Sequence, residues 1–156
     1  MNYFLFLGYD SSKTKLIDAL REKDCNIDYT NKPIYENNLK PYDLIITFGY
    51  KHILKKNLID QCKCPILNLH ISYLPFNRGR HPNFWSFYDG TQSGVSIHLV
   101  DEGIDTGPIL YQKKISLNQK STFAQTYKKL LYEIENLFIE NIDAIINKNW
   151  VAKSQK

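Results

Sequence analysis

Two short stretches of the chain are almost entirely apolar, and they constrain the fold more than any other feature. Tyr3–Leu7 stops at Gly8, and Asp43–Gly49 reads DLIITFG. A strand with one solvent-exposed face alternates apolar and polar residues. A strand covered on both faces is apolar throughout, as in parallel sheets packed between helices. The sequence therefore predicts an α/β fold: an open, mostly parallel, twisted sheet with helices on both faces.

Helix and strand signals alternate between and after these two strands. Asp10, Ser11 and Ser12 offer N-cap chemistry for a first helix that carries Leu16 and Leu20 on one face. The remaining predicted elements are strands at Asn26–Tyr29 or Ile34–Tyr35, Ile66–Ile71, Gly94–Val100 and Ile109–Leu117, the last at a sheet edge, and helices at Lys55–Gln61 and Pro82–Tyr88.

A long C-terminal helix closes the pattern. Thr122 with Gln125 forms a capping-box signature, and apolar residues keep helical spacing from Phe123 to about Asn147. This predicts one helix of roughly 38 Å, at ~1.5 Å per residue, that covers the core. Since no linker or repeat interrupts the chain, residues 1–156 are predicted to form a single domain.

Composition excludes several classes of protein. The net charge of +4 comes without a long run of like charge, so no nucleic-acid partner is expected. The N-terminal apolar run is far shorter than the ~20 residues of a membrane span, so no membrane partner is expected either. Three cysteines cannot all pair within the chain, which favours a reducing, cytoplasmic setting. Cys62 and Cys64 lack a second pair of ligands at zinc spacing, so no metal is expected.

Two polar residues interrupt the apolar strand in ILNLHISYLP, residues 66–75. Asn68 and His70 are two apart and therefore point to the same side of a strand. In open α/β sheets, ligands bind beyond the carboxyl ends of the strands, which is where this pair lies. Two buried polar groups satisfied by the backbone are the alternative. The pair, followed by a loop with Arg78 and Arg80, favours a site.

An acidic loop, DEGIDTGP, follows the strand that ends near Val100. Asp101, Glu102 and Asp105 alternate with glycines that allow tight folding around a ligand. A solvated turn is the alternative, and the ligand spacing of an EF-hand is absent. With Asn68 and His70, the Asp105 carboxylate suits transfer of an acyl group to an amine: an amide and an imidazole stabilise the oxyanion, and the carboxylate orients the imidazole or relays protons. No Ser or Cys stands in a nucleophile context, so direct transfer without an acyl-enzyme is expected.

These segments together resemble the folate-dependent formyltransferases, a group that includes glycinamide ribonucleotide, methionyl-tRNA and sugar N-formyltransferases. The resemblance is strong over Tyr42–Leu110 and faint before it. It implies a Rossmann-like formyltransferase catalytic domain. The segments that carry it are NLHISYLP (68–75), RGRHPNFWSF (78–87), GVSIHLVDEGIDTGPIL (94–110) and, more weakly, YDLIITFGYKHIL (42–54).

The resemblance also implies roles for individual residues. Asn68, His70 and Asp105 would be catalytic, and 10-formyltetrahydrofolate would be the formyl donor. Arg78, Gly79 and Arg80, with Ser11 and Ser12 at a helix start, would face the acceptor. His98 is expected to be structural, and His52 and His81 stay unassigned. The folate-binding residues would be Tyr50, Ile53, Leu54, Val100, Asp101, Glu102, Gly103 and Ile104.

The resemblance leaves the acceptor open. A phosphorylated small-molecule amine is expected, with an amino-sugar nucleotide ahead of glycinamide ribonucleotide. The chain ends after its long helix, without the RNA-contacting domain of methionyl-tRNA formyltransferases, so tRNA is not expected. The short first forty residues suggest a shrunken strand–helix unit and keep open a non-catalytic descendant that binds folate or a partner. A nucleotide-dependent oxidoreductase is disfavoured, because no glycine-rich fingerprint follows the first strand. An exposed edge strand or helix face could pair two copies into a homodimer.

Overall fold

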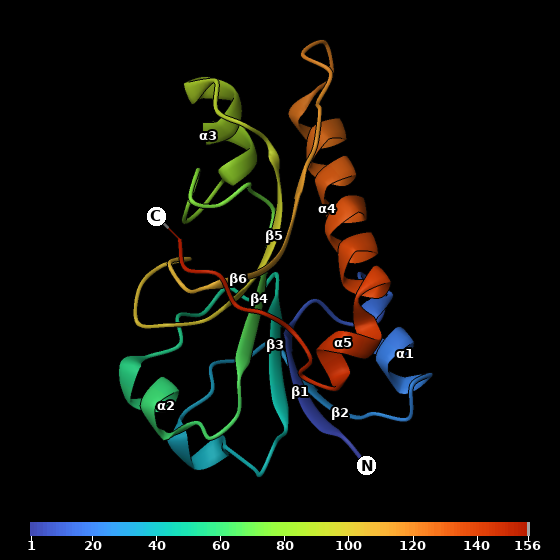
Figure 1. Ribbon diagram of the computed structural model, residues 1–156, viewed down its shortest axis with the longest axis vertical. Helices are drawn as coiled ribbons and strands as arrows, with labels where there is room; N and C mark the ends of the chain where they lie inside the picture. Colours follow the sequence, from blue (N-terminus) through green and yellow to red (C-terminus); the bar gives the residue numbers. More distant parts are fainter. Residues whose placement is uncertain (156) are drawn as a thin grey trace.

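The computed structural model describes residues 1–155, which form one six-stranded sheet flanked by helices (Figure 1). The strands are β1 Tyr3–Gly8, β2 Asn26–Thr30, β3 Leu44–Phe48, β4 Ile66–His70, β5 Gly94–Leu99 and β6 Ile109–Lys114. The helices are α1 Leu16–Arg21, α2 Lys56–Gln61, α3 Pro82–Asp89, α4 Phe123–Glu140 and α5 Ile142–Ile146, with a 3₁₀ helix, η1, at Glu36–Asn38.

The sheet has the strand order β2-β1-β3-β4-β5-β6. The first four strands in this order pair in parallel, and β5 and β6 are antiparallel to their neighbours. The predicted open, mostly parallel sheet is therefore confirmed, with β6 at an edge as expected. The change from parallel to antiparallel pairing falls between β4 and β5.

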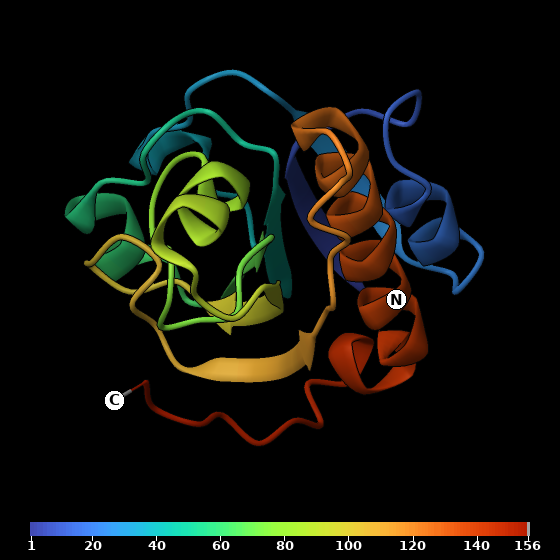
Figure 2. The same ribbon diagram turned by 90° about the horizontal axis from the view of Figure 1, so that it is seen from above.

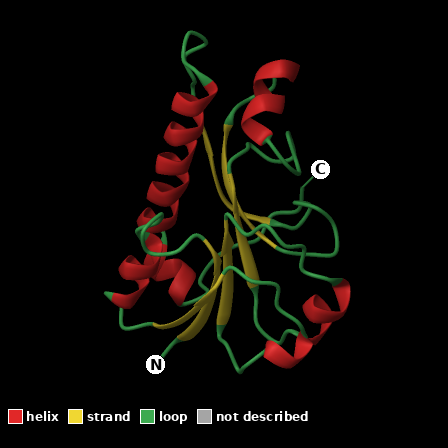
Figure 3. Cartoon of the chain, turned by 180° about the vertical axis from the view of Figure 1, so that it is seen from behind, coloured by secondary structure: helices red, strands yellow, loops and turns green. Residues whose placement is uncertain are grey.

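Helices cover both faces of the sheet, which explains the continuously apolar strands (Figures 2 and 3). On β1, Phe4 and Phe6 pack under α1, α4 and α5 in one buried cluster. Leu5 and Leu7 point the other way and pack with Leu58 of α2 in a second cluster. Phe4–Leu7 is therefore buried on both faces of β1, which explains why this run is apolar.

The predicted C-terminal helix is correct at its start and wrong at its end. Thr122 and Gln125 form the expected reciprocal cap, with hydrogen bonds of 3.1 and 2.9 Å. The helix breaks at Asn141, between α4 and α5. The Asn141 side chain donates to the Leu137 carbonyl at 2.8 Å, and its main-chain N–H donates to the Phe138 carbonyl at 3.1 Å. A side-chain amide thus replaces the helical hydrogen bond and ends α4.

The expected start of the first helix is also wrong. Ser12 N–H donates to the Asp10 carboxylate at 2.9 Å, so this segment is an Asx-type turn, and α1 begins only after its N-cap residue, Lys15. Of the two alternatives for the second strand, Asn26–Tyr29 is correct, since Tyr35 leads into η1. Between β2 and β3 the chain carries only this three-residue 3₁₀ helix, where a strand–helix–strand unit carries an α-helix.

Residues 147–155 follow α5 and are called the C-terminal strap here. They run back past the outer edge of β6, where Ile109 and Lys153 exchange two main-chain hydrogen bonds of 2.7 and 2.9 Å. The strap ends close to the loop that connects β5 to β6, on the far side of the sheet from α5 (Figure 1). Among the described residues, no helix is both long and apolar enough to cross a membrane.

Candidate active site

Three polar side chains lie side by side on neighbouring strands. The register pairs Thr47 of β3 with Asn68 of β4, and Asn68 with His98 of β5. Paired residues on adjacent strands point to the same face of the sheet, so the three side chains meet. The Asp105 carboxylate can only accept, so the Asn68 nitrogen faces Asp105 and His98, and Asn68 Oδ1 lies 2.7 Å from the Thr47 hydroxyl.

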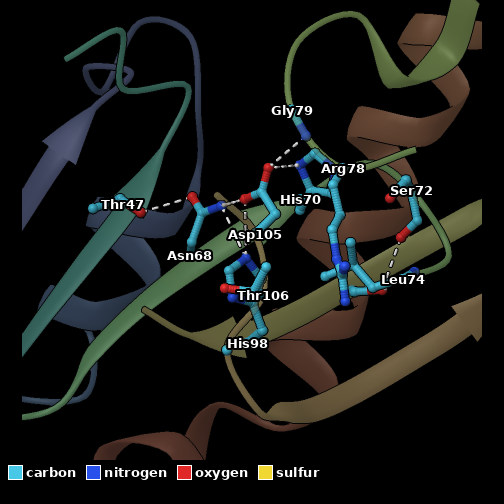
Figure 4. A network of polar contacts seen from close by, with 12 residues as sticks. Thr47, Asn68, His70, Ser72, Leu74, Arg78, Gly79, His98, Asp105 and Thr106 are labelled. Carbon is cyan, nitrogen blue, oxygen red and sulfur yellow. Dashed lines mark hydrogen bonds and ion pairs between the residues drawn. The ribbon is translucent and has the colours of Figure 1, made fainter. Parts of the chain in front are cut away.

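Asp105 joins this row from the loop after β5 (Figure 4). Its Oδ1 accepts a hydrogen bond from Asn68 Nδ2 at 3.0 Å and lies 3.2 Å from His98 Nε2. Its Oδ2 accepts from the Gly79 main-chain N–H at 2.9 Å and lies 3.6 Å from His70 Nδ1. The structure thus brings Asn68, His70 and Asp105 together, and adds His98 and Gly79.

The His70 ring has a defined tautomer. Its Nε2 lies 3.0 Å from the Asn77 carbonyl, which can only accept, so Nε2 carries the hydrogen and Nδ1 faces Asp105. Burial lowers the pKa of His70, and the Asp105 charge opposes this. His70 is therefore neutral at neutral pH, with a lone pair on the nitrogen that faces the carboxylate.

The Asp105 carboxylate is held in its charged form. Burial alone would raise the pKa of Asp105, but the hydrogen bond from His98, the neighbouring His70 and the Gly79 N–H together lower it to about 2. A buried anion thus lies against an uncharged imidazole. This pair can accept a proton on His70 and stabilise the resulting imidazolium through Asp105.

His98 lies in the site, although sequence reasoning set it aside as structural. It is almost fully buried, and its Nδ1 lies 2.8 Å from the Leu99 carbonyl, so Nδ1 carries a hydrogen. The neutral ring then accepts from Asn68 through Nε2, and the protonated ring donates to Asp105. Only the antiparallel register of β4 and β5 places His98 beside Asn68, and the residue pattern of one strand does not reveal how it pairs with another.

A cavity of about 1140 Å³ opens beside these residues. Its lining includes two large apolar side chains that are exposed, Ile53 at 79% and Ile104 at 63%. All eight residues predicted to bind folate lie on its wall: Tyr50, Ile53, Leu54, Val100, Asp101, Glu102, Gly103 and Ile104.

Of the residues predicted to face the acceptor, some lie on the cavity wall and others do not. Gly79 and Arg80 lie on the cavity wall. Arg78 is exposed, is absent from that wall, and donates from Nε and Nη2 to Gln155 Oε1 at 3.2 and 2.8 Å. Ser11 and Ser12 lie in the exposed turn before α1 and off the cavity wall, so the helix-start rationale for them is wrong. Thr47 and Gln155 were not expected from the sequence.

The fold and the site define a class: an α/β domain with an amide, an imidazole and a carboxylate in contact at the wall of a large cavity. Residues 10–142 match the model of the family described as Formyl transferase. The chain belongs to the formyl transferase family.

Relatives of known sequence differ in their acceptors. The dTDP-4-amino-4,6-dideoxyglucose formyltransferase of Mycobacterium tuberculosis H37Rv is 34% identical over 72% of the chain, which spans 47% of that enzyme. The methionyl-tRNA formyltransferase of Finegoldia magna is 35% identical over 81% of the chain, which spans 40% of that enzyme. The matched segment thus spans less than half the length of each of these two relatives.

Solved structures reproduce the fold. The formyltransferase PseJ from Anoxybacillus kamchatkensis, in complex with UDP-4,6-dideoxy-4-formamido-L-AltNAc and tetrahydrofolate, has a TM-score of 0.93 and 32% identity; the match covers 99% of this chain and 82% of PseJ. Phosphoribosylglycinamide formyltransferase from Bacillus halodurans has a TM-score of 0.73 and 20% identity over 95% of this chain and 97% of its own. At 20% identity, the similarity to the Bacillus halodurans enzyme shows a shared fold and nothing further.

Proposed function

We propose that this protein is an N-formyltransferase that moves a formyl group from 10-formyltetrahydrofolate to the amine of an amino-sugar nucleotide. The observation that carries the proposal is the contact of Asn68, His70 and Asp105 at the wall of a cavity of about 1140 Å³. That volume exceeds the ~300–1,000 Å³ of a typical single-ligand pocket and leaves room for two substrates.

The folate group fits the residues present. A flat heteroaromatic ring needs apolar walls and a few fixed donors, and Ile53, Leu54 and Ile104 provide apolar side chains on the cavity wall. The main chain of residues 100–105 provides polar groups beside them. When bound, 10-formyltetrahydrofolate supplies an activated formyl group attached to nitrogen.

Each catalytic residue then has a separate role. Asn68 Nδ2 exchanges one of its two partners, Asp105 Oδ1 or His98 Nε2, for the formyl oxygen and donates to that oxygen as negative charge develops on it. One such donor is worth ~10²–10³ in turnover. His70 Nδ1 accepts the proton that the attacking amine loses as its bond to the formyl carbon forms. Asp105 stabilises the imidazolium, and His70 then returns the proton to the nitrogen that leaves. The described cavity wall carries no Ser or Cys, in keeping with direct transfer.

The acceptor is proposed to carry phosphate. An amine must reach a fixed point unprotonated, so the rest of the molecule must be anchored elsewhere. Gly79 and Arg80 lie on the cavity wall and could anchor the acceptor, because arginine suits bidentate contact with phosphate. An amino-sugar nucleotide is placed ahead of glycinamide ribonucleotide, because PseJ and the mycobacterial enzyme are sugar-nucleotide enzymes at 32% and 34% identity.

Two further proposals concern the protein's surroundings. Cys25, Cys62 and Cys64 are free thiols, which supports a reducing, cytoplasmic location. A homodimer through a sheet edge would use β2 or the part of β6 beyond Ile109, where the strap pairs.

The test is a transfer assay with four acceptors. Purified protein and 10-formyltetrahydrofolate are given a dTDP-4-amino sugar, a UDP-4-amino sugar, glycinamide ribonucleotide or charged initiator tRNA, with Asn68→Ala as the inactive control. Formylation of a sugar nucleotide is expected. Formylation of tRNA alone would overturn the acceptor proposal. Binding of a folate analogue by calorimetry, with no acceptor formylated, would identify a non-catalytic folate-binding protein.

A further inference from the structure

One side chain of the C-terminal strap reaches the candidate active site. Gln155 Nε2 donates to the carbonyls of Asp105 and Gly107, at 2.9 and 2.7 Å. Its Oε1 accepts from Arg78 Nε and Nη2, at 3.2 and 2.8 Å. A carbonyl can only accept and a guanidinium can only donate, so the partners fix the orientation of the amide. Both N–H donors and the oxygen of Gln155 are used.

These hydrogen bonds join two loops that meet at the Asp105 carboxylate. Asp105 adopts a left-handed conformation with φ 53°, which costs a residue other than glycine free energy and has to be held by its surroundings. Gln155 holds the Asp105 main chain from one side. Gly79, the neighbour of Arg78, holds the Asp105 carboxylate from the other side through its N–H.

The strap delivers Gln155 from a fixed position. Two main-chain hydrogen bonds pair Lys153 with Ile109, two residues before Gln155. At its other end, the partly buried Trp150 packs against the core. Gln155 therefore acts as an anchored clamp between the loops.

We propose that Gln155 is a positioning residue, which holds the Asp105 carboxylate in register with Asn68 and His70. The inference rests on the proposed formyl transfer. Arg78 serves as the other half of the clamp, and Arg80 is left to bind phosphate. A misplacement of ~1 Å in a catalytic group can cost ~10²-fold in rate. Loss of the clamp is therefore expected to lower turnover and to leave substrate binding nearly unchanged.

The first test compares Gln155→Met, Gln155→Glu and Ser154→Ala. Methionine matches glutamine in length but cannot form these hydrogen bonds, glutamate keeps only the contact with Arg78, and Ser154 is an exposed neighbour. Gln155→Met and Gln155→Glu are expected to lower kcat by roughly 10–100-fold with KM for both substrates within about threefold, and Ser154→Ala to match the wild type. Wild-type kcat in folded Gln155→Met would overturn the proposal.

A second test does not depend on activity. Amide hydrogen exchange at Gly79, whose N–H donates to Asp105, is expected to be at least about tenfold faster in Gln155→Met. An exchange rate at Gly79 that is unchanged in Gln155→Met would overturn the positioning role of Gln155, whether or not the wild type is active. Absence of formylation by the wild type with every acceptor would refute the proposed function and would leave this measurement unaffected. Should Gln155→Met fail to fold, Arg78→Met removes the other half of the clamp, and the same exchange measurement decides.

Discussion

Replacing Asn68 by aspartate probes the centre of the site with almost no change of shape. The substitution removes the amide donor and places a carboxylate oxygen about 3.0 Å from Asp105 Oδ1, where Asn68 Nδ2 now lies. Two unit charges at that distance repel by about 5 kcal/mol with an effective dielectric constant of ~20. This corresponds to about four pKa units, so the two carboxyl groups should share one proton at neutral pH and titrate as a pair.

The shared proton predicts a reversed pH dependence of stability. The upper folded-state pKa of the pair is raised above the unfolded value of about 4, so the variant is most stable below that pH. It then loses stability as pH rises toward the raised pKa, by up to about 5 kcal/mol. Urea unfolding between pH 4 and 8 measures this. Asn37→Asp, on the exposed η1, adds the same charge away from the cavity wall, and its stability should keep the wild-type pH dependence.

Turnover is expected to fall as well. The variant lacks the donor proposed for the formyl oxygen, so kcat should fall by ~10²–10³-fold while calorimetric affinity for a folate analogue stays within about threefold. Turnover within about threefold of the wild type would remove Asn68 from the chemistry. Stability with the wild-type pH dependence would refute the contact between Asn68 and Asp105.

Three other changes test neighbouring features. In Asp105→Asn, the NMR titration midpoint of His70 should move to lower pH, because the Asp105 charge is what raises it; a move to higher pH contradicts the pairing. Gly107→Ala should destabilise the protein by more than ~3 kcal/mol in denaturant unfolding, since a Cβ there would clash with the Leu99 carbonyl oxygen; wild-type stability would show that the loop lies elsewhere. Ile104→Glu should weaken binding of a folate analogue by at least about tenfold in calorimetry, and unchanged affinity would place the pterin elsewhere.

The elements that could be predicted from sequence are those whose signal is local. Apolar runs located β1 and β3 because both faces of each strand are buried, and the Thr122 cap located the start of α4. Asn68 and His70 stood out because two polar residues on one face of a buried strand need partners. In each case, the residue and the cause of its conformation lie within a few positions of each other.

The features that sequence reasoning missed depend on side chains that compete with the backbone or on distant contacts. Asn141 ends α4 by hydrogen bonding to Leu137, and apolar spacing carries no sign of this. His98 lies thirty positions after Asn68 and meets it only through the β4–β5 register. Gln155 lies fifty positions after Asp105, and only the path of the strap brings it there.

The change of strand direction at β5 explains why the site forms where it does. A parallel neighbour of β4 would end beside His70, and the loop after it would leave from that edge of the sheet. Because β5 is antiparallel, it ends beside the start of β4, where Val100 N–H donates to the Ile66 carbonyl at 2.8 Å. The following loop must then turn back toward β6, and this return brings the Asp105 carboxylate to Asn68. The antiparallel pairing thus places both His98 and Asp105 against β4, and the strap contacts the returning loop from outside through Gln155.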